Sequence, residues 1–194
     1  ASLDILGYTN VTTVPEKQSL KVKSLYTIDS ASPSNFHLPE VVENINAIFQ
    51  TRTPTTQTPS PERIYISRKL ANKRRIENEN ELEATLKKYD FKIVAMEDLS
   101  FLEQSELMRD CKILVSMHGA GLTNMIFMKR EGKILEIRSE GNPPCFVNLA
   151  DAMKHQDYST PCEKTQPELS SNWSNVKVDI EQFNQTIKAL IDNQ

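Results

Sequence analysis

The fold expected for this chain is decided by Lys112-Ile-Leu-Val-Ser-Met-His-Gly-Ala-Gly-Leu-Thr-Asn124, which continues into Met125-Ile-Phe-Met128 and Gly132-Lys-Ile-Leu-Glu-Ile137. The first apolar run predicts a buried strand, the glycine turn interrupts it, and an apolar helix and a second buried strand follow. Such a unit holds phosphate because glycines let the backbone approach a ligand and the helix N-terminus offers unpaired N–H groups. We therefore expect a nucleotide site.

The second strand of this unit carries Glu136 near its end. A carboxylate at the carboxyl edge of a parallel sheet accepts hydrogen bonds from ribose hydroxyls in dinucleotide folds. The predicted ligand is therefore a diphosphate joined to a ribose.

Composition excludes several classes of protein. The chain has 194 residues, 25% charged and 38% hydrophobic, with a net charge of −3, so no bulk basicity suggests nucleic acid. No apolar run is long enough for a signal peptide or a membrane span. The three cysteines lack metal-ligand spacing, which favours free thiols in a reducing compartment. A start at Ala1 rather than methionine favours a piece of a longer polypeptide.

Apolar periodicity predicts strands and helices that alternate five or six times. This alternation is typical of an α/β domain with a parallel sheet and helices on both faces, here a single domain over residues 1–194. Residues 51–61 are expected to form a surface loop rather than a domain linker. The expected strands are 11–14, 20–28, 63–67, 91–96, 112–117, 132–137 and 176–178, and the main expected helices are 39–50, 80–88, 100–108, 144–153 and 179–190.

Capping signals support two of these helices. Asn80-Glu-Leu-Glu83 and Ser100-Phe-Leu-Glu103 both have the form of a capping box. The segment 33–37 follows an expected strand, where a substrate contact or a plain turn is possible, and its Ser, Asn and Pro content favours the turn.

A basic segment, Arg68-Lys-Leu-Ala-Asn-Lys-Arg-Arg75, follows the strand expected at 63–67. Arginine binds phosphate oxygens bidentately, so this segment is a candidate diphosphate site. A solvated basic face is the alternative. The shared sheet edge with the glycine turn favours the functional interpretation.

His118 precedes the glycine turn at the same sheet edge, which favours contact with a ligand or leaving group over a structural role. No His, Asp or Glu cluster has metal-ligand spacing and no Asp-x-Asp occurs, so we expect neither a metal nor another cofactor. The turn is neither a Walker A loop nor a Gly-x-Gly-x-x-Gly fingerprint, and no Gly-x-Ser-x-Gly elbow occurs. Protein cations and N–H groups are expected to stabilise the diphosphate.

Four ordered motifs together resemble the family 61 glycosyltransferases, which include plant xylosyl- and arabinosyltransferases, animal O-linked N-acetylglucosamine transferases and bacterial capsular polysaccharide enzymes. The resemblance is strongest over residues 63–149, and the bacterial capsular type is expected. The motifs are Arg63-Ile-Tyr-Ile-Ser-Arg-Lys with Arg74-Arg75-Ile-Glu-Asn-Glu, Leu99-Ser-Phe-Leu-Glu-Gln104, Val115-Ser-Met-His-Gly-Ala-Gly-Leu-Thr-Asn-Met-Ile-Phe127, and Leu135-Glu-Ile137.

The resemblance implies a two-lobed GT-B architecture, in which this chain is the C-terminal, Rossmann-like lobe that binds the nucleotide sugar. It implies transfer with inversion, with Arg68 and His118 stabilising the leaving diphosphate. The role of Gln104 stays open. The implied donor-binding residues are Ser67, Arg68, Arg75, His118, Gly119, Ala120, Gly121, Leu122, Thr123, Asn124 and Glu136.

The expected partners are a nucleotide sugar, a glycan or other hydroxyl acceptor, and an N-terminal lobe of the same polypeptide that supplies the base. Two alternatives stay open: an enzyme like a nucleotide-sugar epimerase, and a non-catalytic nucleotide-binding domain. The bacterial resemblance and the cysteines favour the cytoplasm, whereas a eukaryotic relative would work in the lumen of the secretory pathway.

Overall fold

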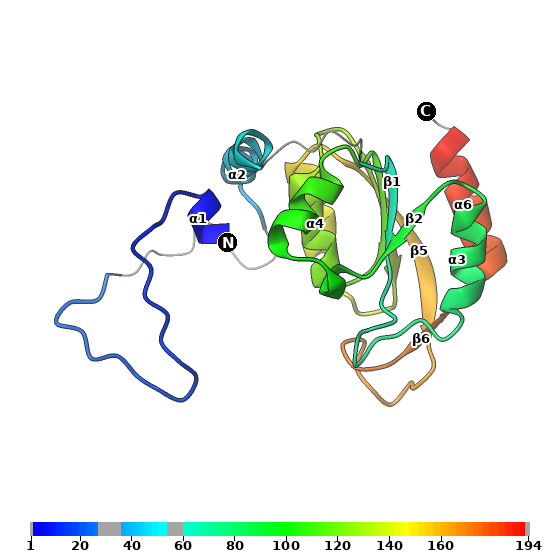
Figure 1. Ribbon diagram of the computed structural model, residues 1–194. Helices are drawn as coiled ribbons and strands as arrows, with labels where there is room; N and C mark the ends of the chain where they lie inside the picture. The colour runs from blue at the N-terminus through cyan, green and yellow to red at the C-terminus, as the bar shows by residue number, and fades with distance from the viewer. Residues whose placement is uncertain (1, 27–35, 54–59, 193–194) are drawn as a thin grey trace.

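The computed structural model describes residues 2–26, 36–53 and 60–192. Its centre is a six-stranded sheet in the order β2-β1-β3-β4-β5-β6 (Figure 1). The strands are β1 (Arg63–Ile66), β2 (Lys92–Val94), β3 (Ile113–Met117), β4 (Lys133–Arg138), β5 (Gln156–Lys164) and β6 (Val176–Val178).

Neighbouring strands from β2 to β5 are parallel, whereas β5 and β6 are antiparallel. The predicted α/β class is confirmed as a mixed α/β fold. The prediction of a purely parallel sheet is wrong at β6, because the chain returns along β5 through the loop at 165–175 instead of a helical crossover.

The strand order reverses between β1 and β3. From β1 the chain adds β2 on one side, then returns to add β3 on the other. Register pairs Ile66 with Ser116, so the residues after these two strands leave the sheet side by side. In open α/β sheets, ligands bind outside the carboxyl ends of the strands at such a reversal.

Helices cover both faces of the sheet, as predicted. Figure 1 shows α2 and α4 on one side and α3 and α6 on the other. The first face carries α2 (Pro39–Arg52), α4 (Phe101–Met108), the 3₁₀ helix η2 (Ala120–Phe127) and α5 (Cys145–Ala152), and the second carries α3 (Glu79–Lys87) and α6 (Ile180–Asp192).

The strands divide their apolar side chains between two cores with the period of two that a pleated sheet imposes. Ile64 and Leu114 face the first core, whereas Tyr65 and Val115 face the second. Three phenylalanine rings join α2, α4 and η2 in the first core. Their centroids lie 4.9 to 5.6 Å apart for Phe49, Phe101 and Phe127.

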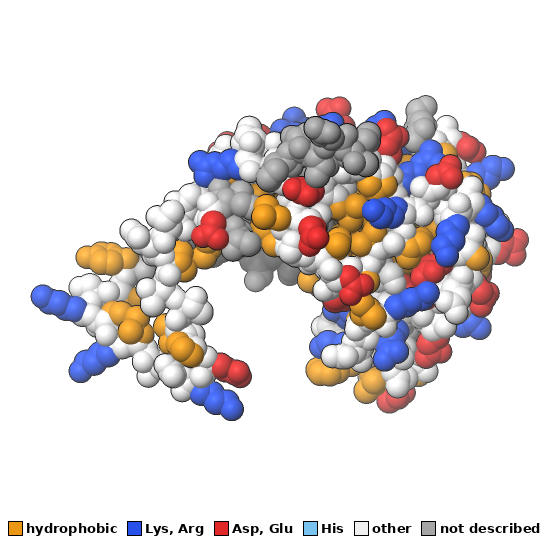
Figure 2. All heavy atoms as spheres, in the orientation of Figure 1, with side chains coloured by type: hydrophobic (Ala, Val, Ile, Leu, Met, Phe, Trp, Pro, Cys, Tyr) orange, Lys and Arg blue, Asp and Glu red, His pale blue; other side chains and the backbone are white. Residues whose placement is uncertain are grey.

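The N-terminal segment after Gly7 stands away from this body, whereas Leu6 packs against the first core. Helix α1 (Ser2–Ile5) is followed by Gly7 at φ +90°, and residues 8–26 form an exposed loop that carries apolar and lysine side chains (Figures 1 and 2). The strands predicted at 11–14 and at 20–26 are wrong, because alternation creates a strand only where a partner strand binds its backbone. Residues 27–28, and 33–35 of the predicted turn, lie outside the described residues.

Two further local predictions are wrong. The loop expected at 161–173 is wrong at residues 161–164, which belong to β5, and no strand was predicted at 156–160. Strand β5 pairs with β4 along six residues despite exposed polar side chains. Helix α3 begins after Asn78 without a side-chain cap, so the capping box at Asn80 is not formed, whereas the Ser100 and Glu103 box at α4 is.

In the described part of the chain, no helix is both long and apolar enough to cross a membrane.

Candidate active site

The glycine turn joins β3 to η2 at the reversal of strand order. Gly121 packs against the sheet so closely that an added Cβ would lie 3.2 Å from Ile66 Cγ2 and 3.7 Å from Ser116 Oγ. Leu122 is fully buried in the first core, and its N–H donates to the Gly119 carbonyl at 2.9 Å. These contacts allow η2 to begin directly above β1 and β3.

Of the other turn residues, one holds the backbone of the turn in place and two are exposed to solvent. The Asn124 side chain donates to the Gly121 carbonyl at 3.1 Å, so it holds the turn. Ala120 and Thr123 are exposed at the start of η2. The first N–H groups of a helix have no partners within the helix and carry its positive dipole end. Ala120 and Thr123 are thus the turn residues that the structure leaves accessible to a ligand.

His118 forms a buried pair with Glu136. Its Nδ1 is hydrogen-bonded to Glu136 Oε1, and the two residues are 4% and 1% exposed. Glu136 lies opposite Ser116 within the sheet, two residues before the end of β4. The predicted contact of Glu136 with a ribose stays a prediction, since the structure shows His118 as the partner of this carboxylate.

The Glu136 carboxylate affects several neighbours. Its second oxygen, Oε2, has no hydrogen bond within the described part of the chain, and Arg138 Nε lies 3.6 Å from it. Burial and the Glu136 charge raise the pKa of Asp157 to about 6, and the same two causes raise the pKa of the Cys145 thiol. Phe146 of α5 packs edge-on against the His118 ring, with centroids 5.1 Å apart. The imidazole is therefore fixed from two sides.

The basic segment after β1 folds back on the turn. Arg68 donates from Nε to the Arg74 carbonyl at 3.0 Å and from Nη2 to the Lys73 carbonyl at 3.1 Å. Arg74 Nη1 in turn donates to the His118 carbonyl at 3.2 Å. Burial, then the neighbouring Arg74, lowers the pKa of the Arg68 guanidinium. The predicted approach of Arg68 and His118 is thus seen, with Arg74 between them.

Arg75 and Ser67 are placed differently. Arg75 Nε donates to the Ala71 carbonyl at 2.9 Å, and its exposed side chain lines a separate cavity of about 510 Å³ with Asn80 and Asn175. Ser67 is buried, and its hydroxyl accepts from the Lys69 N–H at 3.2 Å. The structure therefore does not bring Arg75 to the turn, and it gives Ser67 a part in shaping the loop.

Arg74 is the site residue that sequence reasoning missed. Two consecutive arginines are equivalent by composition, and only the backbone shows which one faces the turn. Arg74 has a left-handed backbone, at φ +56°, which redirects its side chain relative to its neighbours.

Gln104 has a structural role here. Its side-chain amide donates to the carbonyls of Met96 and Leu99 at 3.0 and 3.1 Å, so it holds the 3₁₀ helix η1 (Met96–Asp98) against α4. Within the residues that the structure describes, no group of three or more His, Cys, Asp or Glu side chains is arranged to hold a metal ion.

The sequence model of the family described as Glycosyltransferase 61 matches residues 4–135, which include both the basic segment and the glycine turn. This chain belongs to glycosyltransferase family 61. The match ends one residue before Glu136, so the carboxylate partner of His118 lies just outside it.

Two of the curated proteins to which this chain is similar are animal enzymes. The EGF domain-specific O-linked N-acetylglucosamine transferase of Drosophila melanogaster is 39% identical over 89 residues, which cover 44% of this chain and 17% of the relative. The enzyme of the same name from Bos taurus is 32% identical over 93 residues, covering 45% of this chain and 18% of the relative. The match therefore spans less than a fifth of these relatives.

These relatives correct one expectation. The bacterial capsular type is not supported, because the matching curated proteins are animal transferases.

Proposed function

We propose that this chain is the donor-binding lobe of an inverting, metal-independent GT-B glycosyltransferase that moves a sugar from a nucleotide sugar to a hydroxyl group. The observation that carries the proposal is the meeting of Arg68, His118 and the start of η2 where the strand order reverses. This edge combines fixed positive charge with N–H donors, which a departing diphosphate requires.

The proposed reaction needs two different chemical groups. An acceptor hydroxyl attacks the anomeric carbon from the face opposite the nucleotide and loses its proton to a base, while the bond to the diphosphate oxygen breaks. Arg68 and the η2 N-terminus balance the negative charge on that oxygen. We place the base in the other lobe of the same polypeptide.

His118 serves the leaving group in this proposal. The Glu136 carboxylate holds the proton on Nδ1, as the carboxylate does in a catalytic triad, so Nε2 is the ring nitrogen that exchanges a proton with the ligand. The names of the relatives favour N-acetylglucosamine as the sugar and an O-linked protein residue as the acceptor.

A donor panel tests the proposal. Calorimetric titration of the full-length protein with UDP-, GDP- and CMP-sugars identifies the donor, and product analysis with chelator present tests metal independence and inversion. In Arg68→Ala and His118→Ala we expect transfer to fall by about 10² or more, because each removes a group that acts on developing charge. Unchanged transfer in both variants contradicts the role, and binding without turnover indicates a non-catalytic domain.

A further inference from the structure

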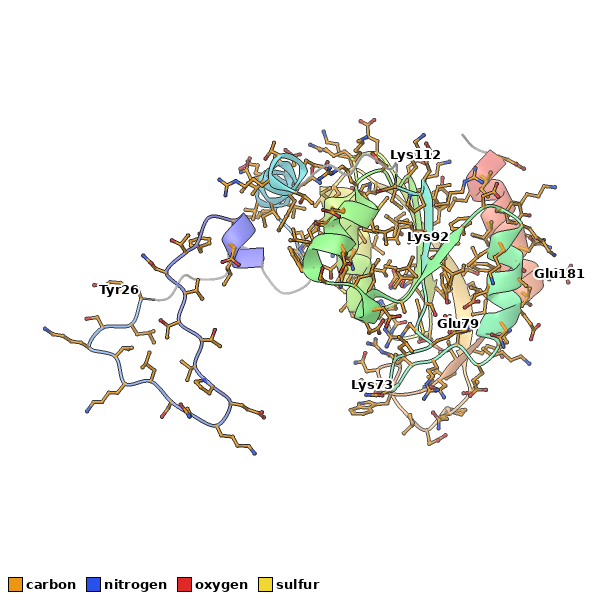
Figure 3. All side chains as sticks on the ribbon, in the orientation of Figure 1. Tyr26, Lys73, Glu79, Lys92, Lys112 and Glu181 are labelled. Atoms are coloured by element: carbon orange, nitrogen blue, oxygen red, sulfur yellow. The ribbon has the colours of Figure 1, made fainter. Side chains whose placement is uncertain are left out.

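Two guanidinium groups converge on Gly119. A Cβ added at this glycine would lie 3.3 Å from Arg68 Nη1 and 3.5 Å from Arg74 Nη2. The two cations therefore approach the same point of the turn from the basic segment. Lys73 lies between the two arginines in sequence. Figure 3 shows Lys73 and Lys112 at opposite ends of the sheet. Because Lys112 precedes β3, the end at Lys73 is the carboxyl edge.

Backbone carbonyls hold this pair in place, not carboxylates. The acceptors are the carbonyls of Lys73 and Arg74 for Arg68, and of His118 for Arg74. Among the described residues, neither arginine has a carboxylate within ion-pairing distance.

The nearby carboxylates are engaged or more distant. Glu79 Oε1 accepts from the Tyr65 hydroxyl at 2.6 Å and from the Arg68 backbone N–H at 3.0 Å. Glu97 and Glu79 raise the pKa of Arg68, but burial and Arg74 lower it by more. Two like charges thus lie together without a matching anion from the described residues, an arrangement that repulsion opposes.

The backbone that presents Arg74 is itself strained. Its φ of +56° is unfavourable for a residue with a side chain, and its Nε is buried with no hydrogen-bond partner among the described residues. The surrounding structure maintains this conformation. Lys73 lies over the Trp173 ring at 3.8 Å, and the Arg75 N–H donates to Asn175 at 3.0 Å. Strain maintained in this way is typical of functional sites.

We propose that Arg68 and Arg74 form a paired-guanidinium site for a phosphate dianion, and that Arg74, not Arg75, is the second arm. Within the proposed function, on which this assignment rests, the ligand is the diphosphate of the donor. Two planar guanidiniums beside a glycine that leaves room for ligand oxygens match a diphosphate in charge and in hydrogen-bond geometry.

Arg75 provides the matched control. It has the same side chain and is the next residue in the chain, yet its guanidinium is bound to the Ala71 carbonyl in a separate cavity. Replacing either arginine removes the same charge from the same segment. A difference in ligand affinity between the two variants therefore reflects where each guanidinium lies and not the loss of charge.

The test is calorimetric titration of the full-length protein and its Arg74→Ala, Arg74→Gly and Arg75→Ala variants with UDP, inorganic pyrophosphate and uridine. We expect both Arg74 variants to bind UDP and pyrophosphate at least about tenfold more weakly, the loss for one or two charge-assisted hydrogen bonds. Arg75→Ala is expected to stay within about twofold. Uridine binding is expected to be the same in all four proteins.

Arg74→Gly keeps the test independent of folding, because glycine adopts φ +56° without strain. The inference is overturned if Arg74→Gly binds pyrophosphate like the wild type, or if Arg75→Ala loses as much affinity. A separate outcome would distinguish the two proposals. If pyrophosphate binding depends on Arg74 but UDP binds no more tightly than pyrophosphate and no donor is turned over, the paired site is supported and the proposed transferase function is contradicted. If the wild type binds neither ligand, both fail.

Discussion

His118 Nδ1 is hydrogen-bonded to Glu136 Oε1 beneath the glycine turn, and both side chains are almost completely buried. The bond joins the end of β3 to the interior of β4. It fixes the plane of the imidazole ring and leaves Nε2 as the nitrogen that can act on a ligand.

Glu136→Gln tests the chemistry of this pair with little change in volume. An amide can donate to Nδ1, which moves the ring proton to Nε2 and reverses the roles of the two nitrogens. We expect kcat to fall by about 10² or more with KM changed less, and the pH profile of kcat to change shape. An exposed carboxylate of the same sheet, in Glu163→Gln, serves as the control. A variant with wild-type kcat and pH profile would show that the pair is only structural.

Gly119→Ala tests the room between the two arginines. The new methyl group would lie 3.3 Å from Arg68 Nη1, so we expect the guanidiniums to separate and the affinity for pyrophosphate to fall about tenfold. Gly141→Ala is the control, because Gly141 has φ +84° and no atom of the described residues lies within 4 Å of the added Cβ. That variant is expected to lose about 1 kcal/mol of stability but no affinity. Equal affinities in the two variants contradict the prediction.

Because of His155, we expect the free energy of unfolding to fall below neutral pH. It is buried, its Nδ1 accepts from the Gly132 N–H at 3.0 Å, and burial, with Arg130, lowers its pKa in the folded state. Below about pH 6.5 the unfolded chain takes up the proton first, so the free energy of unfolding falls, by up to about 1.4 kcal/mol per pH unit. Above that pH both states are neutral and this contribution is constant.

Urea unfolding between pH 5 and 8 measures this effect. His155→Gln is expected to be less stable at pH 7 by about 1 to 3 kcal/mol and to show a flatter pH dependence than the wild type. The partly exposed His37, replaced by Gln, is the control that retains the wild-type slope. A steep slope that persists in His155→Gln assigns the effect to another group.

Asn46 fastens α2 to the end of η2. Its side-chain amide donates to the carbonyls of Ile126 and Met128 at 2.6 and 3.0 Å, and Gln50 donates to Phe127 at 2.7 Å. Asn46→Ala leaves both carbonyls without their donor, so we expect thermal or urea unfolding to show a loss of about 1 to 3 kcal/mol. Gln50→Ala removes one bond and should lose less. The reverse order would show that these bonds do not hold η2.

The sequence was most informative where a strand is buried on both faces. The strands at 63–66, 113–117 and 133–138 were predicted because both of their faces are covered, which requires continuous apolar runs. Strand β5 lacks this pattern, since Gln156, Asp157 and Ser159 are exposed, and its pairing with β4 is decided by tertiary structure.

The candidate site was predictable in location but not in detail. Strand ends at one edge of a parallel sheet place Arg68 beside His118 whatever the side chains do. The choice between Arg74 and Arg75 depends on a single left-handed residue, and the partner of His118 depends on the register of β3 and β4. Neither property leaves a signal in one sequence.

The position of β1 and β3 inside the sheet also determines how this site moves. Each of the two strands is bonded on both sides, so their amide protons are expected to exchange with solvent only when the whole sheet opens. The free energy needed to open the strands beneath the site is then that of unfolding the whole domain. We therefore expect any motion that accompanies ligand entry to occur in the segment 68–75 rather than in the strands beneath it.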